Sequence, residues 1–297
     1  MKCARVWLLV VGLSGASCAS PPTCQDLRTC SADGSRPEPK NDAGPPDAPM
    51  PDSELGDGSH VCGNGVKESG EECDDGTAQN TGGYGKCNSD CTLGPHCGDG
   101  KLNGMDEACD NGADNGLALG NCNPACTGVV RAKTIRIATG LFDASSGFTG
   151  ELTHDWDGFC AADFGFAYKA LIVDHQYPAR IATIAPNKGD GQMNWVLKPY
   201  TRYINTEGDI IWTTDSTALL GVRAGTTAQL QTPLLAQNGA LAWSGFNDDW
   251  TLSSENCKEW GAYDNATTGR AIRLDKLQIQ TVSGYCNENY YLVCVEQ

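Results

Sequence analysis

Aspartates beside glycines are the first residues in this sequence whose chemistry suggests a site. Asp74 and Asp75 directly follow a cysteine, and Asp110 and Asp114 lie in the stretch DNGADNG. Hard carboxylate oxygens in such a setting suit Ca²⁺. The stretch matches a calcium-binding EF-hand loop only in part, because Gly112 stands at a ligand position and no glutamate stands twelfth. We therefore expect these four aspartates either to bind calcium or to form solvated turns.

Tryptophans with polar neighbours form a second candidate site in the C-terminal half of the chain. The residues proposed for it are Trp195, Trp212, Trp250, Asp248 and Asp249. Exposed indole rings beside carboxylates and amides make good contact surfaces for proteins and for the faces of sugar rings. We predict that these five residues contact a ligand. Trp243 and Trp260 are instead assigned to the core.

Catalytic motifs are missing from the sequence. The four histidines form no HExxH pair, and no G-x-S-x-G, phosphate-binding loop or dinucleotide fingerprint occurs. Adjacent acids such as Asp248 and Asp249 could flank a glycosidic bond, but acids in loops are generally solvated. We predict that the protein is not an enzyme. The net charge of −16 excludes electrostatic binding to nucleic acid and argues against anionic lipid partners.

Sixteen cysteines among 297 residues indicate an exported chain with disulfide bonds. Residues 1–19 form a secretory signal peptide, with Lys2 and Arg5 before the apolar run VWLLVVGL. The small residues before Cys18 are similar to a bacterial lipobox, so Cys18 is the candidate lipidation site. Cleavage after Ala19, without an anchor, is the alternative. We expect an outer-membrane lipoprotein at the extracellular face of the bacterial envelope, or a secreted protein, with the membrane reached only through the lipid.

Residues 20–60 are rich in Pro, Asp, Gly and Ser and contain almost no branched or aromatic residue. Such a segment cannot bury enough apolar surface to offset the entropy of ordering it. We predict a disordered acidic tether, long enough to hold the following domains away from a membrane. Cys24 and Cys30 are expected to close a small loop within it.

Residues 61–128 contain two cysteine-rich repeats. Their spacings are C-x10-C-x13-C-x3-C and C-x11-C-x12-C-x3-C, and each repeat begins with CG[ND]G and carries CD[DN]G at its second cysteine. Because Tyr84 is their only Phe, Trp or Tyr, two disulfides per unit must replace an apolar core. Four cysteines allow three pairings, and the spacing leaves the choice open. The repeats resemble the myxobacterial-type cysteine-rich repeat, which implies a spacer or interaction module.

Residues 131–297 hold most of the core-forming residues, including six of the seven tryptophans and all six phenylalanines. Helical spacing within 154–167 places Cys160 inward. Strands are expected at 133–142, 168–174, 240–246, 271–274 and 290–295. A long stretch around 189–217 is interpreted as loop. The fold class is therefore α+β with much irregular structure.

One bacterial family resembles residues 131–297 block by block. The matching blocks, in order, are IRIATGLFDASSGFTGEL, FCAADFGFAYKALIVD, LAWSGF, CKEW and GYCNENYYLVCVEQ. The family is the endostatin-like, C-type-lectin-like domain of unknown function found in leptospiral endostatin-like surface lipoproteins. The resemblance implies a C-type-lectin-like (endostatin-like) fold, in which the first cysteine pairs with the last and the middle two pair together. It thereby implies the disulfides Cys160–Cys294 and Cys257–Cys286.

Some members of that family resemble adhesins, so the resemblance implies an adhesin-like protein that binds a protein or glycan at the cell surface through loops. Calcium-dependent sugar binding needs acid–amide triplets, and the one expected just before the third cysteine is missing before Cys286. The alternatives are a calcium-dependent lectin and a structural envelope protein without a specific ligand, and a hydrolase fits least. Apart from the possible Ca²⁺ at the repeats, no cofactor is expected.

Overall fold

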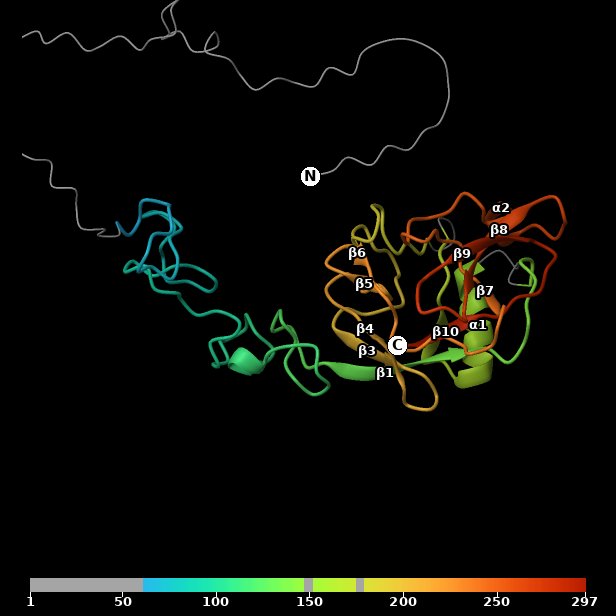
Figure 1. Cartoon of the computed structure of the whole chain (residues 1–297), viewed down its shortest axis with the longest axis horizontal. Helices are drawn as coiled ribbons and strands as arrows, with labels where there is room; N and C mark the ends of the chain where they lie inside the picture. The colour runs from blue at the N-terminus through green and yellow to red at the C-terminus, as the bar shows by residue number, and fades with distance from the viewer. Residues whose placement is uncertain (1–60, 147–151, 175–178) are drawn as a thin grey trace, which may run out of the picture. The chain divides into compact units, whose positions relative to one another are not determined.

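The structure is a computed structural model that describes residues 61–146, 152–174 and 179–297 (Figure 1). The chain divides into two units, Met1–Ser59 and His60–Gln297. The predicted signal peptide, the lipidation site at Cys18 and the tether lie outside the described residues. The second unit contains the two cysteine repeats and the C-terminal domain.

Disulfides shape the two repeats. In each repeat the first cysteine pairs with the fourth and the second with the third. The bonds are Cys62–Cys91, Cys73–Cys87, Cys97–Cys126 and Cys109–Cys122. The only helix or strand described between residues 61 and 128 is the short 3-10 helix η2 (Gly112–Asp114). This nested pattern selects one of the three pairings that the spacing leaves open.

The C-terminal domain is rich in sheet and has few helices. Its elements are β1 (Arg131–Ile137), α1 (Leu152–Phe164), β2 (Tyr168–Ala170), β3 (Thr201–Ile204), β4 (Ile210–Thr213), β5 (Val222–Arg223), β6 (Thr226–Thr227), β7 (Leu241–Trp243), α2 (Cys257–Trp260), β8 (Thr268–Arg273), β9 (Thr281–Tyr285) and β10 (Val293–Glu296). One sheet has the order β2-β10-β1-β3-β4, a second has the order β7-β8-β9, and β5 and β6 form a separate hairpin. This is a disulfide-rich fold of the α+β or mostly-β kind.

Strand β1 is central in the large sheet and changes neighbours along its length. Residues 131–134 pair in parallel with β3, and residues 135–137 pair antiparallel with β10 on the other edge. The first and last strands of the domain therefore lie side by side (Figure 1). Along RAKTIRI only Ile135 is buried, the first two residues are exposed and the others are partly buried.

Helix α1 packs through one stripe of side chains. Trp156, Cys160 and Phe164 recur every four residues, and the first two are fully buried. The helix ends before Gly165, whose φ of +95° is the left-handed conformation that commonly terminates helices.

Two disulfides tie the C-terminal domain together, and they join the pairs that the family resemblance implies. Cys160 of α1 is bonded to Cys294 of β10, and Cys257 of α2 is bonded to Cys286 after β9. The first bond spans a separation of 134 residues. In the chain-entropy model a loop of this length stabilises the fold by about 5 kcal/mol.

Tryptophans are the largest side chains of the core. Trp156, Trp243, Trp250 and Trp260 are all fully buried. Trp243 and Trp260 meet edge to face with ring centroids 5.8 Å apart. The assignment of these two residues to the core is confirmed.

The sequence-based expectation misses strands β3, β4, β5, β6 and β9. Strands β3 and β4 lie in the stretch 189–217 that was interpreted as loop, and they pair antiparallel with each other. Each has only four residues, too few for a clear alternating pattern, so pairing within the sheet decides their conformation.

Among the described residues, no helix combines the length and the apolar character needed to cross a bilayer.

Candidate functional site

Asp110 lies in a cradle of backbone N–H groups in the second repeat. Its carboxylate accepts hydrogen bonds of 2.9, 3.0 and 2.7 Å from the N–H groups of Gly98, Gly100 and Gly112. The side-chain amide of Asn115 donates a fourth bond at 2.8 Å. Burial opposes ionisation, but these donors outweigh it and hold the pKa of Asp110 below its usual range.

Asp74 has the same environment in the first repeat. The donors to its carboxylate are the N–H groups of Gly63, Gly65 and Gly76 and the side-chain amide of Asn80. Gly63 and Gly65, the glycines of CG[ND]G, have φ of +98° and +83°, which turns their N–H groups toward the aspartate of CD[DN]G. The repeat signature is therefore a carboxylate cradle. A carboxylate surrounded by N–H donors has few lone pairs left for a cation.

The other two predicted calcium ligands do not complete a site. Asp75 accepts a hydrogen bond from the N–H of Cys87 at 3.0 Å, and Asn111 Oδ1 accepts the equivalent bond from Cys122 at 2.7 Å. The uncharged Asn111 of the second repeat therefore accepts the same hydrogen bond as the charged Asp75 of the first. The role of this position is to fix the backbone, and it does not need a negative charge. Asp114 is exposed within η2. The geometry of these four residues does not support calcium binding.

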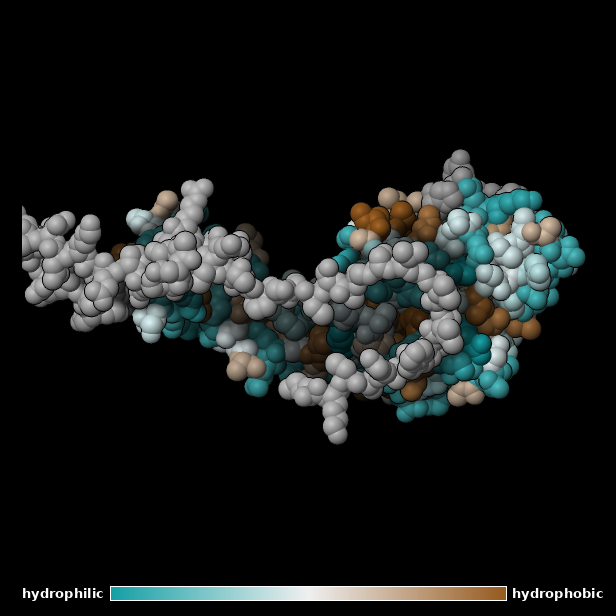
Figure 2. Space-filling view, turned by 45° about the horizontal axis from the view of Figure 1, so that its top comes forward, coloured by the Kyte–Doolittle hydropathy of each residue, from teal (hydrophilic) through white to brown (hydrophobic). Residues whose placement is uncertain are grey.

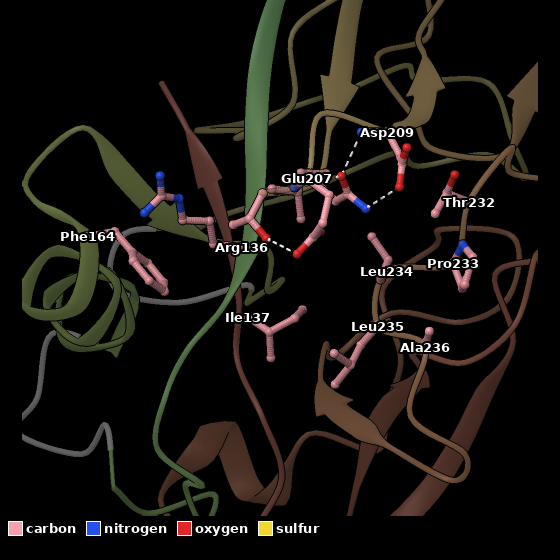
Figure 3. Close-up of a pocket in the computed structure, with 13 residues that line it drawn as sticks. Arg136, Ile137, Phe164, Glu207, Asp209, Thr232, Pro233, Leu234, Leu235 and Ala236 are labelled. Atoms are coloured by element: carbon pink, nitrogen blue, oxygen red, sulfur yellow. Dashed lines mark hydrogen bonds between the residues drawn. The ribbon is translucent and has the colours of Figure 1, made fainter.

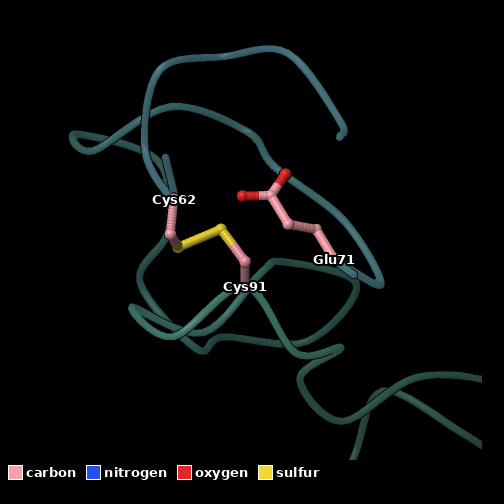
Figure 4. A group of neighbouring side chains, drawn as sticks. All are labelled: Cys62, Glu71 and Cys91. Carbon is pink, nitrogen blue, oxygen red and sulfur yellow. A yellow bond between two sulfur atoms is a disulfide. The ribbon is translucent and has the colours of Figure 1, made fainter. Parts of the chain in front are cut away.

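Two clusters of acidic and sulfur-containing side chains in the described residues have ligand atoms within 4.8 Å of one another. They are Cys62, Glu71 and Cys91, and Glu107, Asp110 and Cys126. All of the cysteines in them form disulfides, as Figure 4 shows for the first cluster. Because metals bind the thiolate form of cysteine, which a disulfide lacks, neither cluster has the chemistry of a metal site.

The prediction of an exposed tryptophan surface is wrong. The exposed fractions of Trp195, Trp212 and Trp250 are 6%, 5% and 1%. Trp250 stacks on Phe246 with centroids 4.4 Å apart and meets Trp195 edge to face at 5.8 Å. Their polar sequence neighbours suggest exposure, but in a domain with many loops these rings supply the core beneath the loops. They do not offer a flat surface to a ligand.

The two predicted acids have different roles. Asp249 Oδ1 accepts hydrogen bonds from the N–H and the hydroxyl of Thr251, at 3.0 and 2.5 Å, and so stabilises the turn around Trp250. Asp248 is exposed, and its Oδ1 accepts a hydrogen bond of 2.5 Å from the N–H of Thr281. Asp248 lines a pocket, so it is the predicted residue best placed to contact a ligand.

This loop pocket has a volume of about 230 Å³. Its polar lining residues are Asn187, Thr227, Asp248, Gln278 and Gln280, and its apolar wall includes Val222, Trp250 and Ile279. They come from four segments: the loop before β3, the β5–β6 hairpin, the turn after β7 and the segment before β9. The volume is smaller than that of drug-sized pockets, and it suits one small polar group, such as a sugar ring or a polar side chain.

Asn187 lines the loop pocket and carries a buried side-chain acceptor without a partner among the described residues. Its N–H donates to the carbonyl oxygen of Asp249 at 2.9 Å, and its backbone has a φ of +54°. Its Oδ1 is buried and has no hydrogen-bond partner in the described part of the chain. A buried acceptor without a donor costs about 1–3 kcal/mol.

The loop that carries Asn187 is held in place from two sides. Gly189, at a φ of +65°, approaches Thr217 so closely that a Cβ atom would lie 2.2 Å from its carbonyl oxygen. The hydroxyl of Thr183 donates to Asp190 at 2.5 Å and, with nearby backbone N–H groups, lowers the pKa of Asp190. The pocket is therefore formed before any ligand arrives.

Sequence reasoning missed Asn187, Gln278 and Gln280. Asn187 lies far from the two glutamines in the chain, and none of the three residues belongs to a motif. The only local signal is the stretch NKGDG at 187–191, which predicts a turn but no ligand.

Apolar side chains form several small, separate groups on the face of the molecule in Figure 2. Phe166, Ile184 and Tyr263 are the most exposed large apolar residues of the C-terminal domain, and they lie on different segments. Such scattered groups are ordinary on a soluble protein surface. They do not identify a second site.

Residues 145–275 match the model of a family described as a protein of unknown function (DUF1554). The matched range covers most of the C-terminal domain and includes Asn187, Asp248 and Trp250. No curated protein matches the chain. The similarity is confined to this domain and names no activity.

Proposed function

We propose that the chain is an exported, lipid-anchored cell-surface binding protein, adhesin-like in kind, whose C-type-lectin-like domain recognises a protein or glycan through its loops. The loop pocket carries this proposal. It brings amides, a hydroxyl and a carboxylate from four segments together around one small cavity. These groups bind polar ligands by hydrogen bonds, and they do not make the nucleophile–base pair of a catalytic site.

Two further observations support the lectin-like part of the proposal. The first and last cysteines of the domain are bonded, and the first and last strands pair. Both features agree with a fold closed by its terminal strand, with long connections left free to form loops. The anchor and the location rest on the sequence around Cys18.

Recognition in this proposal does not depend on calcium. The Oδ1 atoms of Asp248 and Asp249 already accept hydrogen bonds from Thr281 and Thr251. Neither acid belongs to a group of potential metal ligands among the described residues.

The test is binding of the full, disulfide-intact chain to an array of glycans and matrix proteins, with and without EDTA. We expect saturable binding that persists in EDTA. The double substitution Gln278→Ala with Gln280→Ala should lower the affinity at least tenfold. Gln229 is an exposed glutamine outside the pocket, so Gln229→Ala should leave the affinity unchanged. Loss of binding in EDTA would favour a calcium-dependent lectin. A folded chain that binds nothing on the array would favour a structural envelope protein.

A further inference from the structure

Strand β1 has an open edge at its C-terminal end. Its pairing with β3 stops at Thr134. From Asn205 onward the chain turns away from β1. Asn205 Oδ1 accepts hydrogen bonds of 3.1 and 2.7 Å from the N–H groups of Glu207 and Asp209, and these bonds stabilise the turn. In the described part of the chain, residues 135–137 therefore have a strand partner on one side only, where β10 lies.

The backbone of Ile137 faces the open side. The N–H of Thr134 donates to the side chain of Glu296, and the N–H of Ala138 donates to the carbonyl of Leu292, so both face β10. Successive residues of a strand direct their N–H and C=O groups to alternate edges. The N–H and C=O of Ile137 are therefore directed away from β10, and an unpaired edge of this kind is a template for another strand.

A groove of about 550 Å³ lies along this edge. Ile137 projects into it from β1, and Leu234 and Leu235 project from the segment 232–236 on the opposite wall (Figure 3). The volume is within the range of ligand-binding pockets. An apolar side chain of an added strand fits between the two walls.

The end of the groove at the β3–β4 turn is acidic. Glu207 and Asp209 are exposed, and neither forms an ion pair among the described residues. Arg136 is the only cation that lines the groove, and its guanidinium carbon lies 5.3 Å from the ring centroid of Phe164, turned away from the two acids (Figure 3). The two carboxylates accept hydrogen bonds from Thr206 and Asn205 but have no cationic partner in the described part of the chain, so they complement a lysine or arginine of a ligand.

We propose that this groove binds an extended segment of a partner protein, added as a strand to β1 at Ile137. Hydrogen bonds to the Ile137 backbone supply affinity, while an apolar side chain against Leu234 and Leu235 and a basic side chain beside Glu207 and Asp209 supply selectivity. The groove shares no lining residue with the loop pocket, so the two sites are independent.

Calorimetric titration of the full chain with a capped peptide of alternating valine and lysine tests this proposal. We expect saturable binding of one peptide per chain. Successive backbone nitrogens of an extended peptide point to opposite edges. N-methylation of two successive central nitrogens therefore prevents hydrogen bonding to β1 through either edge, and it should lower the affinity at least tenfold. A peptide of alternating valine and glutamate should bind at least tenfold more weakly.

Variants of the chain locate the binding. Glu207→Gln combined with Asp209→Asn should lower the affinity at least tenfold, and Ala236→Arg, at an exposed position of the groove wall, should do the same. Asp106→Asn, which removes an exposed carboxylate from a cysteine repeat, should change the affinity less than twofold. Near-ultraviolet circular dichroism verifies that each variant is folded.

Three outcomes overturn the proposal. One is equal binding of the N-methylated and unmodified peptides, which is the behaviour of unspecific attraction to a chain of net charge −16. Another is binding that none of the groove variants weakens. The third is no binding to the folded chain at millimolar peptide.

Discussion

The first cysteine repeat and the C-terminal domain each contain a disulfide that spans a separation of 29 residues, Cys62–Cys91 and Cys257–Cys286. In the chain-entropy model the two bonds stabilise their surroundings equally, by about 3–4 kcal/mol. Their surroundings differ. Turns and a carboxylate cradle surround the first, whereas Cys257 and Cys286 belong to a core cluster that includes Trp243 and Trp260. The comparison teaches that the consequence of losing a disulfide depends on whether an apolar core shares the stabilisation.

Removing these two disulfides in turn is the strongest test of the comparison. Cys62→Ala with Cys91→Ala should unfold the first repeat, because a unit without an apolar core has no comparable source of stability. Cys257→Ala with Cys286→Ala should leave the C-terminal domain folded with a lower melting temperature. Hydrogen exchange measured by mass spectrometry reports on both regions in one experiment. Equal loss of protection in the two variants would contradict the comparison.

Truncating a core tryptophan should have the next largest effect. Trp250→Ala should destabilise the C-terminal domain by about 3–5 kcal/mol, because it leaves a cavity beside Phe246 and Trp195. Phe166→Ala is the matched control, since that ring is 97% exposed, and it should change the free energy of unfolding by less than about 0.5 kcal/mol. Urea unfolding followed by tryptophan fluorescence measures both. Similar values for the two variants would show that Trp250 lies outside the core.

Replacing a cradle aspartate should loosen one repeat and leave the C-terminal domain unchanged. Asp110→Asn puts an amide NH₂ group against N–H donors, so the amides of Gly98 and Gly100 should exchange faster with solvent. Asp114→Asn is the control, because no hydrogen bond to the carboxylate of Asp114 is described. Unchanged protection in Asp110→Asn would mean that the cradle does not stabilise the repeat.

Lowering the pH should protonate Asp74 and Asp110 and so weaken, step by step, the hydrogen bonds that stabilise each repeat. The pKa values of Asp74 and Asp110 are lowered in the folded state, so the unfolded state binds protons more readily. Their stabilisation is therefore complete above the unfolded pKa of about 3.9 and is lost as the pH falls below it. In ¹⁵N-labelled chain, the amide resonances of Gly63 and Gly98 should shift with pH at a midpoint below about pH 3.9, the ordinary pKa of an aspartate. A titration midpoint at or above about pH 3.9 would contradict the lowered pKa values.

Calcium should have the smallest effect of all. Because N–H donors already surround Asp74 and Asp110, addition of calcium or EDTA should leave the amide resonances of both repeats in place. A saturable shift of the Gly98 or Gly100 resonance on addition of calcium would instead show that calcium binds at Asp110.

Local patterns in the sequence predicted the features that depend on neighbouring residues. The segment 154–167 was expected to be helical and α1 forms there, and Cys160 points inward because a stripe every four residues is a local property. Trp243 and Trp260 are buried as expected. Exposure of Trp195, Trp212 and Trp250 was predicted wrongly, since the identity of sequence neighbours says little about which loops fold over a ring.

Sequence alone determined that the repeats depend on disulfides, because their cysteine spacing is regular and they have almost no aromatic residues. It also determined that most of the core-forming residues lie in the region 131–297, although not which of its tryptophans are buried. Tertiary structure alone decided the order of the cysteine pairs in the repeats, the meeting of Asn187 with Asp248 in one pocket, and the open edge at Ile137. The reason is physical: each of these depends on contacts between segments distant in the chain, and their free energy arises only when the whole domain packs.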